Sequence, residues 1–93
     1  MVMPFLYFRG RINLDDVDDL DSTPLHWAAY MNCENVVAYI ISDGDFQGLN
    51  KKDKEGNTPL MLAVTYGNTR VTRRLLIKGA NRRIKNNEDK IPL

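Results

Sequence analysis

A seven-residue segment that recurs 35 positions later constrains the fold of this 93-residue chain more than any other feature. The segment T-P-L-H-W-A-A begins at Thr23 and returns as T-P-L-M-L-A-V from Thr58. A third copy starts as I-P-L at Ile91, 33 positions after the second. A fixed period of this size indicates a repeat protein, in which one small supersecondary unit stacks on copies of itself.

Each copy of the segment carries the signals of a short helix. The threonine can cap the helix N-terminus with its hydroxyl, and the proline then takes the first helical position, where its missing N–H costs nothing. Leucine and alanine continue as a small apolar face that lets neighbouring helices approach closely. The motif residues are Thr23, Pro24, Leu25 and His26 in the first copy and Thr58, Pro59 and Leu60 in the second.

A second helix is predicted after each first one. Asn32 and Gly67 mark the reversal between the helices, because both residue types tolerate a left-handed backbone. Gly44 and Gly79 are predicted to cap the C-termini of the second helices. The apolar positions of these helices are Val36, Val37, Ile40 and Ile41 in one unit and Val71, Leu75 and Leu76 in the next.

Polar segments with turn residues separate the helix pairs. Asp53 and Gly56 fit an Asp-x-x-Gly turn, and Asp21 takes the place of the glycine in the preceding copy. These segments predict hairpin-like fingers over residues 18–22, 53–57 and 86–90.

The period of about 33 residues and the T-P-L-H-x-A signature resemble those of ankyrin repeats. The resemblance implies an all-α fold, a solenoid of stacked helix-turn-helix pairs with short β-hairpin-like fingers. Phe5 to Gly10 is interpreted as the end of a second helix, so we expect the chain to be part of a longer solenoid. Within a single domain, 1–93, the expected units are the end of a preceding repeat at 1–17, repeats at 18–52 and 53–85, and the start of another at 86–93.

The resemblance also implies a binding surface. In an ankyrin first helix, the residue after the histidine and the one three further on face the concave groove. Trp27 and Tyr30 are therefore expected beside Leu62 and Thr65 of the next repeat, with Tyr66 at one end. Aromatic residues are common anchors of protein interfaces, so we expect a scaffold that binds a protein through this groove and the finger tips. Packing of Trp27 against the base of the neighbouring finger is the alternative.

Charge is divided unevenly along the sequence. Residues 1–50 hold two basic and eight acidic residues, a net charge of −6, whereas residues 51–93 hold eleven basic and four acidic residues, a net charge of +7. The basic half contains a candidate surface for anionic membranes or acidic partners, and a solvated helix face is the alternative. Its residues are Arg70, Arg73, Arg74, Lys78, Arg82 and Arg83. Nucleic acid is not expected, because no aromatic residues alternate with the basic ones.

Residues for catalysis or metal binding are scarce. His26 is the one histidine, and a hydrogen-bonding role at the helix start explains it. The one cysteine, Cys33, excludes an intramolecular disulfide and fits a reducing, cytoplasmic location. The run of aspartates from Asp15 to Asp21 lacks the glycine and distal glutamate of the known calcium loop. We therefore expect no enzymatic activity, metal or cofactor in these residues. Separately, the apolar ends of the stack predict self-association.

The second half resembles a narrower family. Residues 74–87, with S-T-P-L-H-W-A from Ser22 upstream, are similar to the ankyrin region of Asp-His-His-Cys palmitoyltransferases. In that family ankyrin repeats precede transmembrane helices and a cysteine-rich catalytic domain. The resemblance implies, as an alternative function, a regulatory or substrate-recruiting module at the cytosolic face of a membrane. The family's catalytic and metal-binding residues have no counterparts in this sequence.

Overall fold

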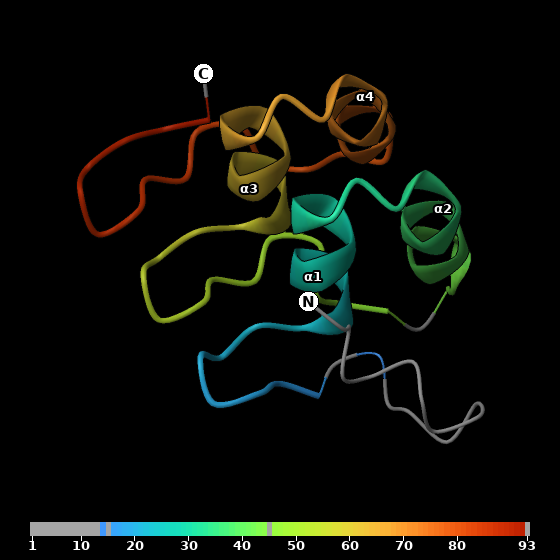
Figure 1. Cartoon of the computed structure of the whole chain (residues 1–93), viewed down its shortest axis with the longest axis horizontal. Coiled ribbons are helices and arrows are strands. Elements are labelled where there is room, and N and C mark those ends of the chain that lie inside the picture. Colours follow the sequence, from blue (N-terminus) through green and yellow to red (C-terminus); the bar gives the residue numbers. More distant parts are fainter. Residues whose placement is uncertain (1–13, 15, 45, 93) are drawn as a thin grey trace.

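Two helix pairs stacked side by side form the described part of the chain (Figure 1). The structure is a computed structural model and describes residues 14, 16–44 and 46–92. The first pair is α1 (Pro24–Tyr30) and α2 (Glu34–Ser42), and the second is α3 (Pro59–Thr65) and α4 (Thr69–Ile77). Helix α1 packs against α3 and α2 against α4, which gives two layers of helices. No strand occurs among the described residues, so the predicted all-α repeat architecture is confirmed.

The helices of the inner layer begin where the repeated segment predicts. Thr23 and Thr58 are the N-caps of α1 and α3, and their hydroxyls accept hydrogen bonds from the backbone N–H of His26 at 3.2 Å and of Met61 at 3.3 Å. The proline that follows each threonine is buried at the first helical position. Two local signals, a hydroxyl cap and a proline, therefore start both helices.

The reversals between paired helices also follow the prediction, whereas one of the two predicted C-terminal caps is wrong. Asn32 and Gly67 both have positive φ, 57° and 70°. Gly79 follows α4 with a φ of 102°, as a C-terminal glycine should. Gly44 is absent from the positive-φ glycines, because α2 ends at Ser42 and its C-cap residue, Asp43, is already extended, so the chain leaves the helix without a left-handed residue.

Three fingers project from the inner layer, on the side away from α2 and α4 (Figure 1). In each finger the backbone N–H of the first residue donates to the carbonyl of the last, at 2.9–3.0 Å. Neighbouring fingers are joined as well. Lys54 donates its N–H to the Leu20 carbonyl at 3.0 Å, and Asn87 donates its N–H to the Glu55 carbonyl at 3.0 Å. The three fingers, at 18–22, 53–57 and 86–90 as predicted, thus form a continuous row.

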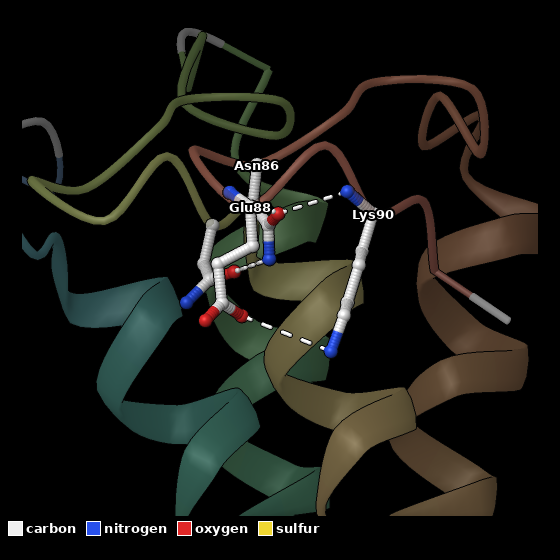
Figure 2. Close-up of polar contacts among 4 residues, drawn as sticks. Asn86, Glu88 and Lys90 are labelled. Carbon is white, nitrogen blue, oxygen red and sulfur yellow. Dashed lines mark hydrogen bonds and ion pairs between the residues drawn. The ribbon is translucent and has the colours of Figure 1, made fainter.

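One side-chain oxygen organises each finger. Oδ1 of the first residue, which is Asp18, Asp53 or Asn86, accepts the backbone N–H groups two and four positions later. Figure 2 shows this in the third finger, where Asn86 accepts from Lys90 and Lys90 in turn pairs with Glu88. The acidic residues at the starts of the first two fingers therefore complete backbone turns.

The core lies between the two layers and between the two pairs. The apolar positions of the inner helices and the predicted positions of the outer ones supply it, although Val36 and Ile41 are only partly buried and Leu76 is 36% exposed. The predicted helix end at 5–10 lies outside the described residues. The fully or nearly fully buried side chains are those of Leu25, Ala28, Ala29, Val37, Ile40, Leu60, Ala63, Val71, Leu75 and Ala80.

Candidate functional site: the concave groove

A surface hollow lies in the angle between the inner helices and the fingers. Its volume is about 190 Å³, and it is lined by α1, by α3 with its C-cap residue, and by the first two fingers. The fold determines where this hollow lies. The fingers project from the N-terminal ends of α1 and α3, so finger residues and one face of these helices line the same space. The lining residues are Leu20, Ser22, His26, Trp27, Tyr30, Asp53, Glu55, Leu62 and Tyr66.

Three aromatic rings form one continuous group on this floor. Tyr30 stands edge-to-face with Trp27, with ring centroids 6.1 Å apart and planes at 84°. It stands in the same way against Tyr66, at 4.8 Å and 90°. Such T-shaped pairs are favourable because the positive edge of one ring meets the negative face of the other. Tyr30 and Tyr66 remain 36% and 55% exposed, so the group is held in place while part of it faces solvent.

Trp27 contacts the first finger as well as the groove. Its indole N–H donates to Oδ2 of Asp18 at 2.8 Å, and the side chain is half-buried. Partial burial raises the pKa of Asp18, but the N–H groups of Ser22, Trp27 and Leu20 together outweigh this and leave the pKa below its ordinary value. The carboxylate therefore stays charged and orients the indole. Trp27 thus lines the groove and also contacts a finger, so the two positions given above as alternatives are occupied by the same side chain.

The structure brings together four of the five predicted groove residues. Trp27, Tyr30, Leu62 and Tyr66 line the hollow, whereas Thr65 is exposed on α3 and is not part of its lining. The sequence analysis expected the fingers to contribute but named none of their residues, and the lining shows these to be Leu20, Ser22, Asp53 and Glu55. The repeat register could have indicated part of this. Leu20 and Glu55 are 35 residues apart, the same offset as the helix motifs, so they occupy equivalent places on neighbouring fingers.

His26 has the structural role that its motif predicts. It is buried, with Nδ1 accepting from the Thr23 N–H at 3.1 Å and Nε2 lying 2.9 Å from the carbonyl oxygen of Asn57. The hydrogen-bond network assigns the proton to Nε2, which donates to Asn57. Burial lowers the pKa of His26 against the opposing effect of the Asn57 carbonyl, so the ring is neutral at pH 7. Both ring nitrogens are occupied by the fold, which leaves neither for proton transfer to a ligand.

The carboxylate of Glu34 partly neutralises the predicted basic surface. Arg74 donates its Nε–H to Oε2 of Glu34 at 2.7 Å, and Nη1 of Arg70 lies 3.8 Å from Oε1 of the same carboxylate. The hydrogen bond from Arg74 is the main reason why the pKa of Glu34 lies below its ordinary value. Arg73 is exposed on α4, and the remaining basic residues follow that helix. These are Lys78, which caps α4, and Arg82 and Arg83 in the segment beyond it, all exposed.

Two further observations concern metals and membranes. Within the described residues, no three His, Cys, Asp or Glu side chains are grouped so that they could hold a metal ion. Over the same residues, none of the helices has the length and apolar character needed to cross a bilayer.

Stacked helix-turn-helix units with capped inner helices, projecting fingers and a concave surface between them define the chain as a helical repeat protein. It belongs to the ankyrin-repeat family: the family profile described as "Ankyrin repeats (3 copies)" matches residues 2–88. Modules of this family generally bind other proteins.

A curated relative supports the same family. The human protein named transient receptor potential cation channel subfamily A member 1 is 33% identical over 86 residues, which cover 92% of this chain. The match covers only 8% of that protein, so the chain spans a small part of its relative's length. The similarity to Asp-His-His-Cys palmitoyltransferases finds no support in these comparisons.

Proposed function

We propose that this chain binds a protein partner in its concave groove, with Trp27, Tyr30 and Tyr66 as the anchors. The observation that supports the proposal is the group of three edge-to-face rings, of which two are exposed. Rigid aromatic side chains provide a large contact area at little entropic cost and dominate the energetics of many interfaces. The finger tips, with Leu20 58% exposed beside the hollow, extend this surface.

Tyr66 offers the cleanest test of the groove. It is the C-cap residue of α3 and 55% exposed, so its ring can be removed with little loss of core packing. Trp27 is less suitable, because truncation would also break its hydrogen bond to Asp18. Tyr39 is the matched control, since it is 71% exposed on α2, in the outer layer and outside the hollow.

The experiment selects binding peptides from a displayed random library with the wild-type chain and then measures their affinity for both variants. Tyr66→Ala should weaken binding by about 2 kcal/mol, roughly thirtyfold, as expected for an aromatic anchor. Tyr39→Ala should bind as the wild type does. Equal affinities for all three proteins, or equal losses in both variants, would place the binding surface elsewhere.

Neither the palmitoyltransferase alternative nor an anionic membrane surface is favoured by a specific observation. For the first, the decisive observation would be an Asp-His-His-Cys motif between hydrophobic segments in the same polypeptide, and the described residues contain neither. For the second, Glu34 lies against two of the arginines and reduces the net charge of the basic surface. A cytoplasmic location and the repeat boundaries derived above remain predictions.

A further inference from the structure

The hollow in the groove combines aromatic walls with negative charge. Two carboxylates, those of Asp53 and Glu55, share its lining with Trp27, Tyr30 and Tyr66. Among the described residues no lysine or arginine belongs to this lining, and His26 is neutral and bound at both ring nitrogens. In the part of the chain that the structure describes, a ligand that enters the hollow therefore meets aromatic rings and carboxylates without a compensating cation.

We propose that the hollow receives a basic side chain, an arginine or a lysine, of the protein partner. This inference rests on the proposed function and specifies the chemistry of the partner. Cations are attracted to the negative faces of aromatic rings, most strongly to tryptophan and tyrosine. Because Tyr30 stands at about 90° to both of its neighbours, the group presents ring faces in more than one direction.

The size of the hollow favours one side chain over a small-molecule ligand. Sites for small molecules usually enclose about 300–1,000 Å³. At 190 Å³, this hollow accommodates the end of one long side chain. Leu20 and Leu62 supply apolar surface for the methylene groups of a lysine or arginine, whose stems commonly pack on such surfaces while the charged end stays polar.

Glu55 is the carboxylate best placed to meet the cation. Oδ1 of Asp53 is occupied by the backbone N–H groups of Glu55 and Asn57. The carboxylate of Glu55, in contrast, makes no hydrogen bond or ion pair with any described residue, and its side chain is exposed. The adjacent Lys54 is not among the described residues that line the hollow, although it lines the gap between the second and third fingers together with Glu55. With respect to the described residues, Glu55 is thus an unpaired negative charge at the edge of an aromatic surface.

The test uses four blocked heptapeptides with apolar flanks that differ only at the central residue: arginine, lysine, norleucine or glutamate. Titrations are followed through the indole N–H resonance of Trp27, the one tryptophan in the chain. Glu55→Gln removes the charge proposed to meet the cation. Glu88→Gln is the matched control, because Glu88 takes the equivalent place on the third finger and is exposed outside the hollow.

The arginine or lysine peptide should bind about fivefold more tightly than the norleucine peptide, the factor expected for an exposed cation–π contact with one surface ion pair. The glutamate peptide should bind most weakly. Glu55→Gln should remove the ion-pair part of the preference for the basic peptide, leaving about twofold from the cation–π contact, and should leave norleucine binding unchanged, whereas Glu88→Gln should change neither.

Equal binding of the norleucine and basic peptides would overturn the cation assignment while leaving the groove as a binding surface. Equal effects of Glu55→Gln and Glu88→Gln would overturn it too, since they would show a general effect of net charge. A failure of the proposed function is a different result. In that case Tyr66→Ala would bind its library-selected peptides as tightly as the wild type does.

Discussion

The contact between the second and third fingers leaves no room for a methyl group on Gly56. A Cβ atom there would lie 2.6 Å from Oδ1 of Asn87 and 2.7 Å from its backbone nitrogen. That nitrogen donates the hydrogen bond to the Glu55 carbonyl that joins the two fingers. Gly56→Ala therefore has to displace backbone, in addition to holding alanine at a φ of +79°.

Gly67 provides a control that has the same backbone problem without the contact. Its φ is +70°, and a Cβ atom would have no neighbour within 4 Å. Alanine in the left-handed region destabilises the folded state by about 1–2 kcal/mol. The substitution also reduces the conformational entropy of the unfolded chain, which offsets about 0.4–1 kcal/mol of that loss. Gly67→Ala should thus lower the free energy of unfolding by about 1 kcal/mol.

The additional cost at Gly56 comes from the displaced finger. Forcing an extra methyl group into a filled space typically costs about 1–3 kcal/mol, and a weakened backbone hydrogen bond adds about 0.5–1.5 kcal/mol. Gly56→Ala should therefore be less stable than Gly67→Ala by about 2 kcal/mol or more. Urea denaturation followed by Trp27 fluorescence measures both variants, at an m-value of about 1–3 kcal/mol per molar for a small domain.

Equal losses in the two glycine variants would refute this reasoning, because they would show that the fingers separate at no cost. A larger decrease in the free energy of unfolding for Gly67→Ala than for Gly56→Ala would contradict the observation that the space around Gly67 is open. In either case the row of finger contacts would contribute little to the stability of the stack.

Four other predictions concern stability and association. Burial lowers the pKa of His26, so the histidine binds its proton in the unfolded chain before it does so in the folded one as the pH falls. The free energy of unfolding, measured by urea titration, should be constant above the unfolded pKa of about 6.5 and then decrease by at most about 1.4 kcal/mol per pH unit. His26→Gln should remove this slope. Asn68→Ala should lower the free energy of unfolding by about 1–3 kcal/mol, because the buried amide donates to the Ala29 carbonyl at 2.6 Å. Asn50→Ala should lower it less, because water can replace the exposed hydrogen bond that Asn50 accepts from the Asn81 N–H. Liposome sedimentation should recover more protein with anionic than with neutral lipid if the basic surface binds membranes, and equal recovery would end that hypothesis. Sedimentation equilibrium should show dimers or larger species at high concentration, and a strictly monomeric chain would show that the ends of the stack are well covered.

Local sequence signals were sufficient for most of the architecture. The threonine–proline start of α1 and α3, the reversal at Asn32 and the turn at Asp53 each depend on residues only a few positions apart. Hydroxyl caps, left-handed residues and aspartate turns act within a few bonds of their own position, so the sequence shows them directly. Gly44 was mispredicted because glycine permits a left-handed cap without requiring one.

The site depended on contacts that no local pattern contains. Glu34 pairs with Arg74 from 40 positions away, and Glu55 shares the hollow with the aromatic group only because the second finger projects beside α1 and α3. Such pairs follow from the offset between successive units and from the angle at which a finger leaves its helix. The aromatic residues themselves were identifiable, because the repeat register assigns them to one face.

The two edges of the stack are joined by bonds of different stiffness. On the finger edge, backbone hydrogen bonds such as that from Lys54 to Leu20 link successive units, and they are short and directional. On the outer edge, α2 and α4 pack through apolar side chains, and their polar links are the exposed ion pairs of Glu34, which are formed by long side chains and screened by salt. Under load the outer edge should therefore depend mainly on its apolar packing, because its ionic links are the more easily screened. The resistance of the stack to bending should decrease as ionic strength rises, which gives a small solenoid of this kind an elastic response that depends on the solution around it.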